Sequence, residues 1–254
     1  MSDIILKIES SVAHIILSKP KLNILDINAL KKLTLLLDEI KENEEIKLIS
    51  IESDQKVFCA GVDITEHSEE NFKEMLESFH NVFFKMLELD VPTVSMVKSA
   101  CLGGGCELAL FSDFVLATNT AYFQQPEINL GCYPPISLVY FPYITSHKKA
   151  LEIILTGRKF SAEEAKEAGL INNVFKEEEF ETESQKFIDS IVKNSASVIK
   201  TVLNGYKKLH FKEELKENIK KSENIYFEDL MSLHDTKEGI SSFIEKRQPN
   251  WKNK

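Results

Sequence analysis

Hydrophobic and polar positions along the chain predict alternating strands and helices over its first two thirds. An apolar spacing near 3.6 residues predicts one helix after Asp26, which can cap it, and a second helix from Glu69 to Leu89. Runs of β-favouring residues predict strands at 4–8, 12–17, 46–51, 93–97 and 114–117. The first two strands are close enough in sequence to form a hairpin. The alternation continues to about residue 175 and is typical of an α/β fold with an at least partly parallel sheet.

The last third of the chain has a different pattern. Between Glu179 and Lys246 no segment alternates as a strand does, and apolar residues recur at helical spacing. A short helix before this region is marked by the capping box from Ser161 to Glu164 and by Gly169 at its C-terminal end. We therefore expect an α/β core over residues 1–178, which holds the functional site, and a helical region over residues 179–254.

Composition and charge exclude several classes of function. The 254 residues are 43% hydrophobic and 28% charged, which is the profile of a folded protein. The 40 acidic residues exceed the 31 lysines and arginines, and the formal charge of -9 repels a phosphate backbone. No apolar run reaches the length of about 18 residues that a membrane span needs, and the first residues lack the pattern of a signal peptide. Neither nucleic acid nor a membrane is expected as a partner.

The cysteines and histidines show no metal-binding pattern. The chain has no C-x2-C pair, no H-x3-H and no H-E-x-x-H motif, so no metal site is expected. Cysteines without such spacing are expected to be reduced thiols, which favours a cytoplasmic location. The four cysteines are Cys59, Cys101, Cys106 and Cys132.

Two glycine-bearing loops are candidates for binding an anion. The cluster Gly103-Gly104-Gly105 lacks the third glycine of the dinucleotide fingerprint, and no Walker A lysine follows it. It precedes a predicted short helix, where free backbone N–H groups and the helix dipole favour negative charge. Residues 58–63 form a second loop of small residues after a strand, and its N–H groups can also stay unpaired. One N–H group from each loop, aimed at a common oxygen, would form an oxyanion hole.

Two glutamates accompany these loops. Glu107 lies at the start of an otherwise apolar helix, and Glu127 follows Pro126 at the end of the next strand region. A carboxylate pair beside an oxyanion hole can supply acid and base catalysis to one acyl group. A strand-to-helix turn, close backbone packing and solvated surface glutamates would contain the same residue types, so these alternatives stay open at this point.

In these motifs the sequence resembles the crotonase superfamily of enoyl-CoA hydratases and isomerases over nearly its whole length. The resemblance implies repeated ββα units that form a spiral core of two roughly perpendicular sheets. It also implies that the helical region 179–254 makes oligomer contacts in a homotrimer or a homohexamer. The substrate would be an acyl-CoA thioester, and no cofactor would be needed because coenzyme A is part of the substrate. The matching motifs are residues 58–63, 102–107, 125–131, 155–158, 161–169 and 246–251.

The same resemblance implies a role for individual residues. The backbone N–H groups of Val62 and Gly104 would hold the thioester oxygen, and Glu107 and Glu127 fall on the two catalytic glutamates of the hydratases. Members that only shift a double bond commonly keep one of the pair, so the presence of both favours addition of water. Thr65 stands where some members have lysine. The substrate-binding residues implied in this way are Ala60, Val62, Asp63, Ile64, Thr65, Gly104 and Tyr133.

One departure from the straight-chain hydratases concerns the acyl pocket. Where those enzymes have a glycine-rich stretch, this chain has Cys132-Tyr133-Pro134-Pro135, and two prolines fix backbone angles and remove N–H donors. This stretch, together with residues 23–26 and Glu66-His67, is similar to cyclic dienoyl-CoA hydratases, which add water to cyclohexa-1,5-diene-1-carbonyl-CoA in the anaerobic degradation of aromatic compounds. His67 and Tyr140 are further candidate pocket residues. Isomerisation, C–C hydrolysis, decarboxylation and non-catalytic acyl-CoA binding remain as alternative functions.

Overall fold

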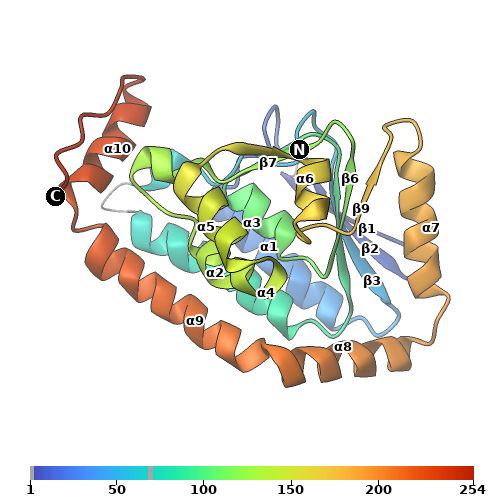
Figure 1. Ribbon diagram of the computed structural model, residues 1–254. Coiled ribbons are helices and arrows are strands. Elements are labelled where there is room, and N and C mark those ends of the chain that lie inside the picture. The colour runs from blue at the N-terminus through green and yellow to red at the C-terminus, as the bar shows by residue number, and fades with distance from the viewer. Residues whose placement is uncertain (1–2, 68–70) are drawn as a thin grey trace.

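The computed structural model describes residues 3–67 and 71–254, which form two β-sheets enclosed by helices (Figure 1). The larger sheet has the strand order β1-β2-β3-β4-β6-β9, and the smaller one has the order β5-β7-β8. The strands of the larger sheet are β1 (Ile4–Glu9), β2 (Val12–Leu17), β3 (Leu48–Ser53), β4 (Thr93–Val97), β6 (Phe114–Thr118) and β9 (Asn173–Phe175). Those of the smaller sheet are β5 (Ala100–Leu102), β7 (Tyr122–Gln124) and β8 (Lys159–Ser161).

The larger sheet is parallel except for its opening hairpin. β1 and β2 pair antiparallel, with Ile4 opposite Leu17, and this confirms the predicted hairpin. The pairs β2–β3, β3–β4, β4–β6 and β6–β9 are parallel. β3 begins two residues later than predicted, because the N–H group of Ile46 bonds the carbonyl oxygen of Asn43 at 3.3 Å in the turn that follows α1. Ile46 is buried as part of this turn and not of the strand.

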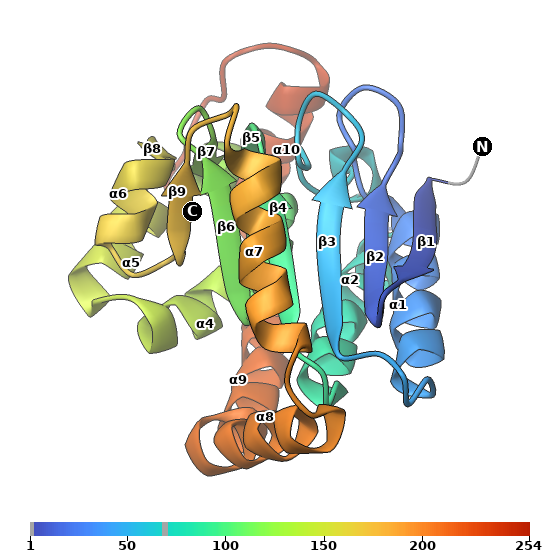
Figure 2. The same ribbon diagram turned by 90° about the vertical axis from the view of Figure 1, so that its right-hand side faces the viewer.

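Helices cover both faces of the larger sheet. In Figure 2, α7 (Phe180–Val192) lies in front of the sheet, while α1 (Ile27–Lys41) and α2 (Phe72–Glu88) lie behind it. As predicted, Asp26 caps α1, since its carboxylate accepts a 2.8 Å hydrogen bond from the N–H group of Ala29. The predicted start of the second helix at Glu69 lies outside the described residues. The other helices of this part are α3 (Gly104–Leu110), α4 (Pro135–Ile144), α5 (His147–Thr156) and α6 (Ala162–Glu167), with 3-10 turns η1 (Ile64–His67) and η2 (Pro126–Leu130).

Residues 179–246, all of which the structure describes, form helices and turns without a strand, as the apolar spacing predicts. After α7, they comprise α8 (Ala196–His210), α9 (Lys212–Ile225), the π-helix η3 (Tyr226–Leu230) and α10 (His234–Ile244). Figure 1 shows α8 and α9 as an arc along one edge of the molecule that leads to α10, which packs against η1 and η2. No helix among the described residues has the length and apolar character to cross a bilayer.

Candidate active site

A cavity of about 560 Å³ opens between the loops of the α/β core and the C-terminal helices. The core contributes the loops at 60–64, 102–104 and 126–132 to its wall. The C-terminal region contributes Tyr226 of η3, Phe243 of α10 and Arg247 just beyond it. The packing of α10 against η1 and η2 brings these distant segments together. The cavity therefore contains both predicted glycine loops, and it is closed by a part of the chain that carries no catalytic motif.

The two predicted N–H donors lie on loops that touch each other. Gly61 has φ +108°, a conformation that favours glycine, and a Cβ atom placed on it would lie 3.6 Å from the Gly104 nitrogen. A Cβ atom on Gly104 would in turn lie 2.9 Å from Val62 Cγ1. Among the described residues, neither the Val62 nor the Gly104 N–H group donates to a protein acceptor. Two free donors on adjacent loops at the cavity wall are what binding of one anionic oxygen requires.

Glu107 is fixed by the start of another helix. It lies on α3 and is 3% exposed, and its Oε1 accepts hydrogen bonds of 2.8 Å from the N–H groups of both Ile136 and Ser137. These N–H groups are free because they belong to the first turn of α4, which begins with Pro135. Burial raises the pKa of Glu107 to about 7, although the two N–H groups act in the opposite direction. The carboxyl group can therefore gain or lose a proton near neutral pH.

Glu127 lies on η2 and lines the cavity. Its Oε1 would be 2.8 Å from a Cβ atom placed on Gly103, whose carbonyl oxygen accepts the 3.0 Å hydrogen bond of the Glu107 N–H group. Gly103 thus contacts the Glu127 side chain and the Glu107 backbone. Burial, and then the nearby carboxylate of Glu107, raise the pKa of Glu127 well above its usual range. Neither carboxylate takes part in the ion pairs found among the described residues.

A buried amide connects the two glutamates. With its amide oriented to satisfy both ends, Gln125 accepts a 2.5 Å hydrogen bond from Ser137 Oγ and donates to Glu127 Oε2 at 3.2 Å. It also donates to the carbonyl oxygen of Gly103 at 3.3 Å. Since the Ser137 N–H group binds Glu107, a single chain of polar groups joins both carboxylates to the glycine loop. The sequence places Gln125 in a family motif but does not show these contacts.

The remaining predicted residues separate into those at the cavity and those away from it. Ala60, Asp63, Ile64 and His67 line the cavity. Among the described residues, Thr65 is not part of the lining, and its Oγ1 donates instead to Asp63 Oδ1 at 2.7 Å.

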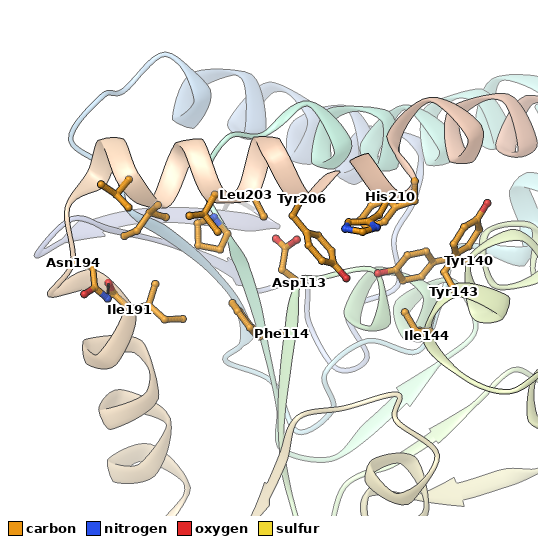
Figure 3. A pocket seen from close by; sticks show the side chains of 15 residues that line it. Asp113, Phe114, Tyr140, Tyr143, Ile144, Ile191, Asn194, Leu203, Tyr206 and His210 are labelled. Atoms are coloured by element: carbon orange, nitrogen blue, oxygen red, sulfur yellow. Dashed lines mark hydrogen bonds between the residues drawn. The ribbon is translucent and has the colours of Figure 1, made fainter. Parts of the chain in front are cut away.

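Both candidate tyrosines lie on other hollows. Tyr133 donates its hydroxyl to the carbonyl oxygen of Ser222 at 2.9 Å and lines a neighbouring cavity of about 480 Å³. Tyr140 lies on a third hollow, a groove of about 720 Å³ beneath α8. Figure 3 shows Tyr206 and His210 of α8 opposite Tyr140 and Tyr143 in this groove, whose lining is mainly apolar.

Sequence reasoning missed the C-terminal wall of the cavity and the partners of Glu107. Tyr226, Phe243 and Arg247 line the cavity, but the helical spacing around them resembles that of any amphipathic helix. The terminal motif at 246–251 was a usable signal for Arg247 alone. The contact between Ile136 and Glu107 could have been suspected from Pro135. A proline often starts a helix, and the first turn of a helix has free N–H groups that can bind a carboxylate.

The structure offers thiols but no metal site in the part of the chain that it describes. All four cysteines are buried and free. Within residues 3–67 and 71–254, no three histidine, cysteine, aspartate or glutamate side chains are arranged to hold a metal ion.

Comparisons with known proteins show which proteins this chain is similar to. The family model for enoyl-CoA hydratase/isomerase matches residues 7–254. A solved enoyl-CoA hydratase from Mycobacterium avium subsp. paratuberculosis K-10 superposes with a TM-score of 0.88 over 99% of each chain, at 21% identity. The cyclohexa-1,5-dienecarbonyl-CoA hydratase of Thauera aromatica is 28% identical over 97% of this chain and 95% of that protein. The probable mitochondrial enoyl-CoA hydratase of Dictyostelium discoideum is 31% identical over 96% of this chain and 88% of its own.

The fold therefore defines the class of protein: it is the α/β crotonase fold, with two sheets and C-terminal helices, as the sequence predicts. The chain belongs to the enoyl-CoA hydratase/isomerase family. It is accordingly an enzyme of the hydro-lyase type. Hydratases of this family use no cofactor, and coenzyme A is part of their substrate.

Proposed function

We propose that this enzyme adds water to a conjugated cyclic dienoyl-CoA thioester, cyclohexa-1,5-diene-1-carbonyl-CoA, with Glu107 and Glu127 as the catalytic residues. The observation that carries the proposal is the chain of polar contacts that joins the two buried carboxyl groups through Ser137 and Gln125, next to the loop that holds a free N–H group at Gly104. A carboxyl pair of this kind can hold and transfer protons, and the N–H pair can hold the oxygen on which negative charge develops.

The proposed mechanism assigns one task to each group. The Val62 and Gly104 N–H groups hold the thioester oxygen and stabilise the enolate, each contributing about 3 to 4 kcal/mol in the transition state. The two carboxyl groups position a water molecule, remove its proton as it attacks the β-carbon, and deliver a proton to carbon. Because close carboxyl groups titrate as a pair, the proton that they hold at rest belongs to both Glu107 and Glu127. Ala60, Asp63 and Ile64 bind the coenzyme A side of the substrate in this proposal.

Two observations support the cyclic substrate. The Thauera aromatica relative carries that activity in its name and matches nearly the full length of the chain. Pro135 begins α4, whose first turn holds Glu107, so the stretch that departs from the straight-chain hydratases positions a proposed catalytic residue.

Mass detection after incubation with two thioesters tests the proposed reaction. We expect cyclohexa-1,5-diene-1-carbonyl-CoA to gain the mass of one water molecule faster than crotonyl-CoA does. Preference for crotonyl-CoA would overturn the cyclic assignment and leave a straight-chain hydratase. A rearranged product of unchanged mass would overturn hydration in favour of isomerisation.

We also propose that a second copy of this chain covers the groove beneath α8, within a homotrimer or a homohexamer. An exposed apolar row runs along α8 above the groove, and Val202 in this row is 65% exposed. Monomeric proteins rarely leave so continuous an apolar surface in water. The family resemblance, which places oligomer contacts in the region 179–254, supports a second copy as the partner. The row consists of Val198, Val202, Tyr206 and Leu209.

A charge placed in this row is expected to weaken the assembly. We expect light scattering after size-exclusion chromatography to give a trimer or hexamer mass for the wild type and a smaller mass for Val202→Glu. Thr201→Glu is the matched control, because Thr201 is exposed on the same helix but does not line the groove. A monomeric wild type, or an unchanged mass for Val202→Glu, would contradict the proposal.

The cytoplasmic location stays a prediction. The four free cysteines are compatible with a reducing compartment.

A further inference from the structure

The cavity has an open mouth and a closed end. At the mouth, Phe243 is 51% exposed, whereas Cys132 and Tyr226 are 3% and 2% exposed. Glu127 is next to this closed end, since its carbonyl oxygen accepts the 3.0 Å hydrogen bond of the Cys132 N–H group. Val62 packs against the buried cluster that contains Cys132 and Tyr226, so an acyl group whose thioester oxygen is held at Val62 and Gly104 would lie next to these two residues.

The ring of Tyr226 is held firmly in this position. It stacks on Phe72 with ring centroids 5.3 Å apart and lies 4.9 Å from the ring of Tyr133. Tyr133 is itself anchored by its hydrogen bond to Ser222, one turn earlier on α9. Tyr226 also begins η3, a π-helical turn, and such turns are frequent at functional sites. The ring is consequently a rigid end wall, because its displacement would disturb the packing of both neighbouring rings.

Cys132 lies in the same buried apolar cluster as Tyr226 and Phe72. Its thiol donates to the carbonyl oxygen of Leu130 at 3.6 Å. The end wall is therefore packed on the Cys132 side as well.

We propose that Tyr226 is the residue that limits the size of the acyl group, and that its ring restricts the substrate to short or compact ring-shaped acyl groups. The proposal rests on the proposed function, because it assumes that an acyl-CoA thioester occupies the cavity. A flat ring can fill a short cavity that ends at Tyr226, whereas each further methylene of a straight chain would have to displace packed side chains. The ring of Tyr226, and not its hydroxyl, provides the size limit.

Binding of saturated acyl-CoA thioesters from butanoyl to decanoyl, measured by titration calorimetry, tests this without requiring turnover. For the wild type we expect affinity to fall at least about tenfold between butanoyl and octanoyl. Tyr226→Ala is expected to gain at least about tenfold in affinity for octanoyl-CoA, since the end wall is removed. Tyr226→Phe keeps the ring and is expected to keep the wild-type order of affinities.

Phe227→Ala is the matched control, because Phe227 belongs to the same π-helical turn and packs on Phe72 but does not line the cavity. We expect it to keep the wild-type order of affinities. Should Tyr226→Ala fail to fold, Tyr226→Leu shortens the side chain while keeping an apolar contact with Phe72. An unchanged order in the folded variant, or the same gain in Phe227→Ala, would overturn the role of Tyr226. Absence of hydration with every thioester would instead overturn the proposed function and leave the binding result intact.

Discussion

Replacing either Glu107 or Glu127 with glutamine is expected to lower the turnover of hydration by about 100-fold or more. Glutamine keeps the size and polarity of the side chain but cannot take a proton from water or return one to carbon. The thioester contacts of the N–H pair and the cavity wall remain, so affinity for a saturated acyl-CoA should stay within a few-fold of the wild type. Steady-state kinetics and calorimetry measure the two quantities separately. Wild-type turnover in both variants would discard acid-base catalysis by these residues.

The stability of Glu107→Gln as a function of pH shows whether the carboxyl group is buried as described. Because the pKa of Glu107 is raised from 4.5 to about 7, the folded protein keeps a proton that the unfolded chain has already lost. Its contribution to the free energy of unfolding therefore falls as pH rises from about 4.5 to about 7, by about 3 kcal/mol in total. Glutamine has no proton to lose, so urea unfolding should show the variant gaining stability relative to the wild type across this window. Parallel pH profiles would contradict the burial of this group.

Gly103→Ala is expected to lower turnover about as much as the glutamine substitutions do, because it displaces the Glu127 carboxylate. Gly103 has φ +52°, which costs a residue with a side chain about 1 to 3 kcal/mol. The new Cβ atom would also lie 2.8 Å from Glu127 Oε1, closer than the two atoms can approach, so Glu127 must shift. We expect turnover to fall by about 100-fold and the free energy of unfolding to fall by about 1 to 3 kcal/mol.

Gly205→Ala is the matched control for this substitution. Gly205 lies within α8, and a Cβ atom there would meet no atom within 4 Å. Alanine is the better helix former, so the variant should be as stable as the wild type or more stable by up to about 1 kcal/mol, with unchanged turnover. If Gly103→Ala behaved like this control in both measurements, the close approach of Gly103 and Glu127 would be refuted.

The sequence predicts well those features that depend on neighbours along the chain. The caps at Asp26 and Ser161 were visible because the partners lie three residues apart, and the structure contains both hydrogen bonds. Of the predicted capping box only the Ser161 half forms, since the Glu164 carboxylate pairs with Arg158 and Lys149. The boundary of β3 was less accurate, because Ile46 has the apolar character of a strand residue but is buried in a turn.

In the candidate active site, too, the sequence predicts the local motifs but not the contacts between distant segments. The family motifs are local runs of residues, and they identified the glycine loops and both glutamates without any coordinates. They did not predict the position of Tyr133 correctly. Tyr133 lies in the stretch that differs from the straight-chain hydratases, and it lines the neighbouring cavity. A side chain within a motif can point to either side of its loop, and its direction depends on packing against segments far along the chain.

The sequence by itself determined the α/β class, the helical C-terminal region and the family, because periodicity, capping and motif spacing are properties of contiguous residues. Only the tertiary structure decided which groups meet: the first turn of α4 at Glu107, Gln125 between the two carboxylates, and Tyr226 at the end of the cavity. The physical reason is that burial and hydrogen bonding at these atoms come from segments separated by many residues. Their approach follows from the packing of the whole chain.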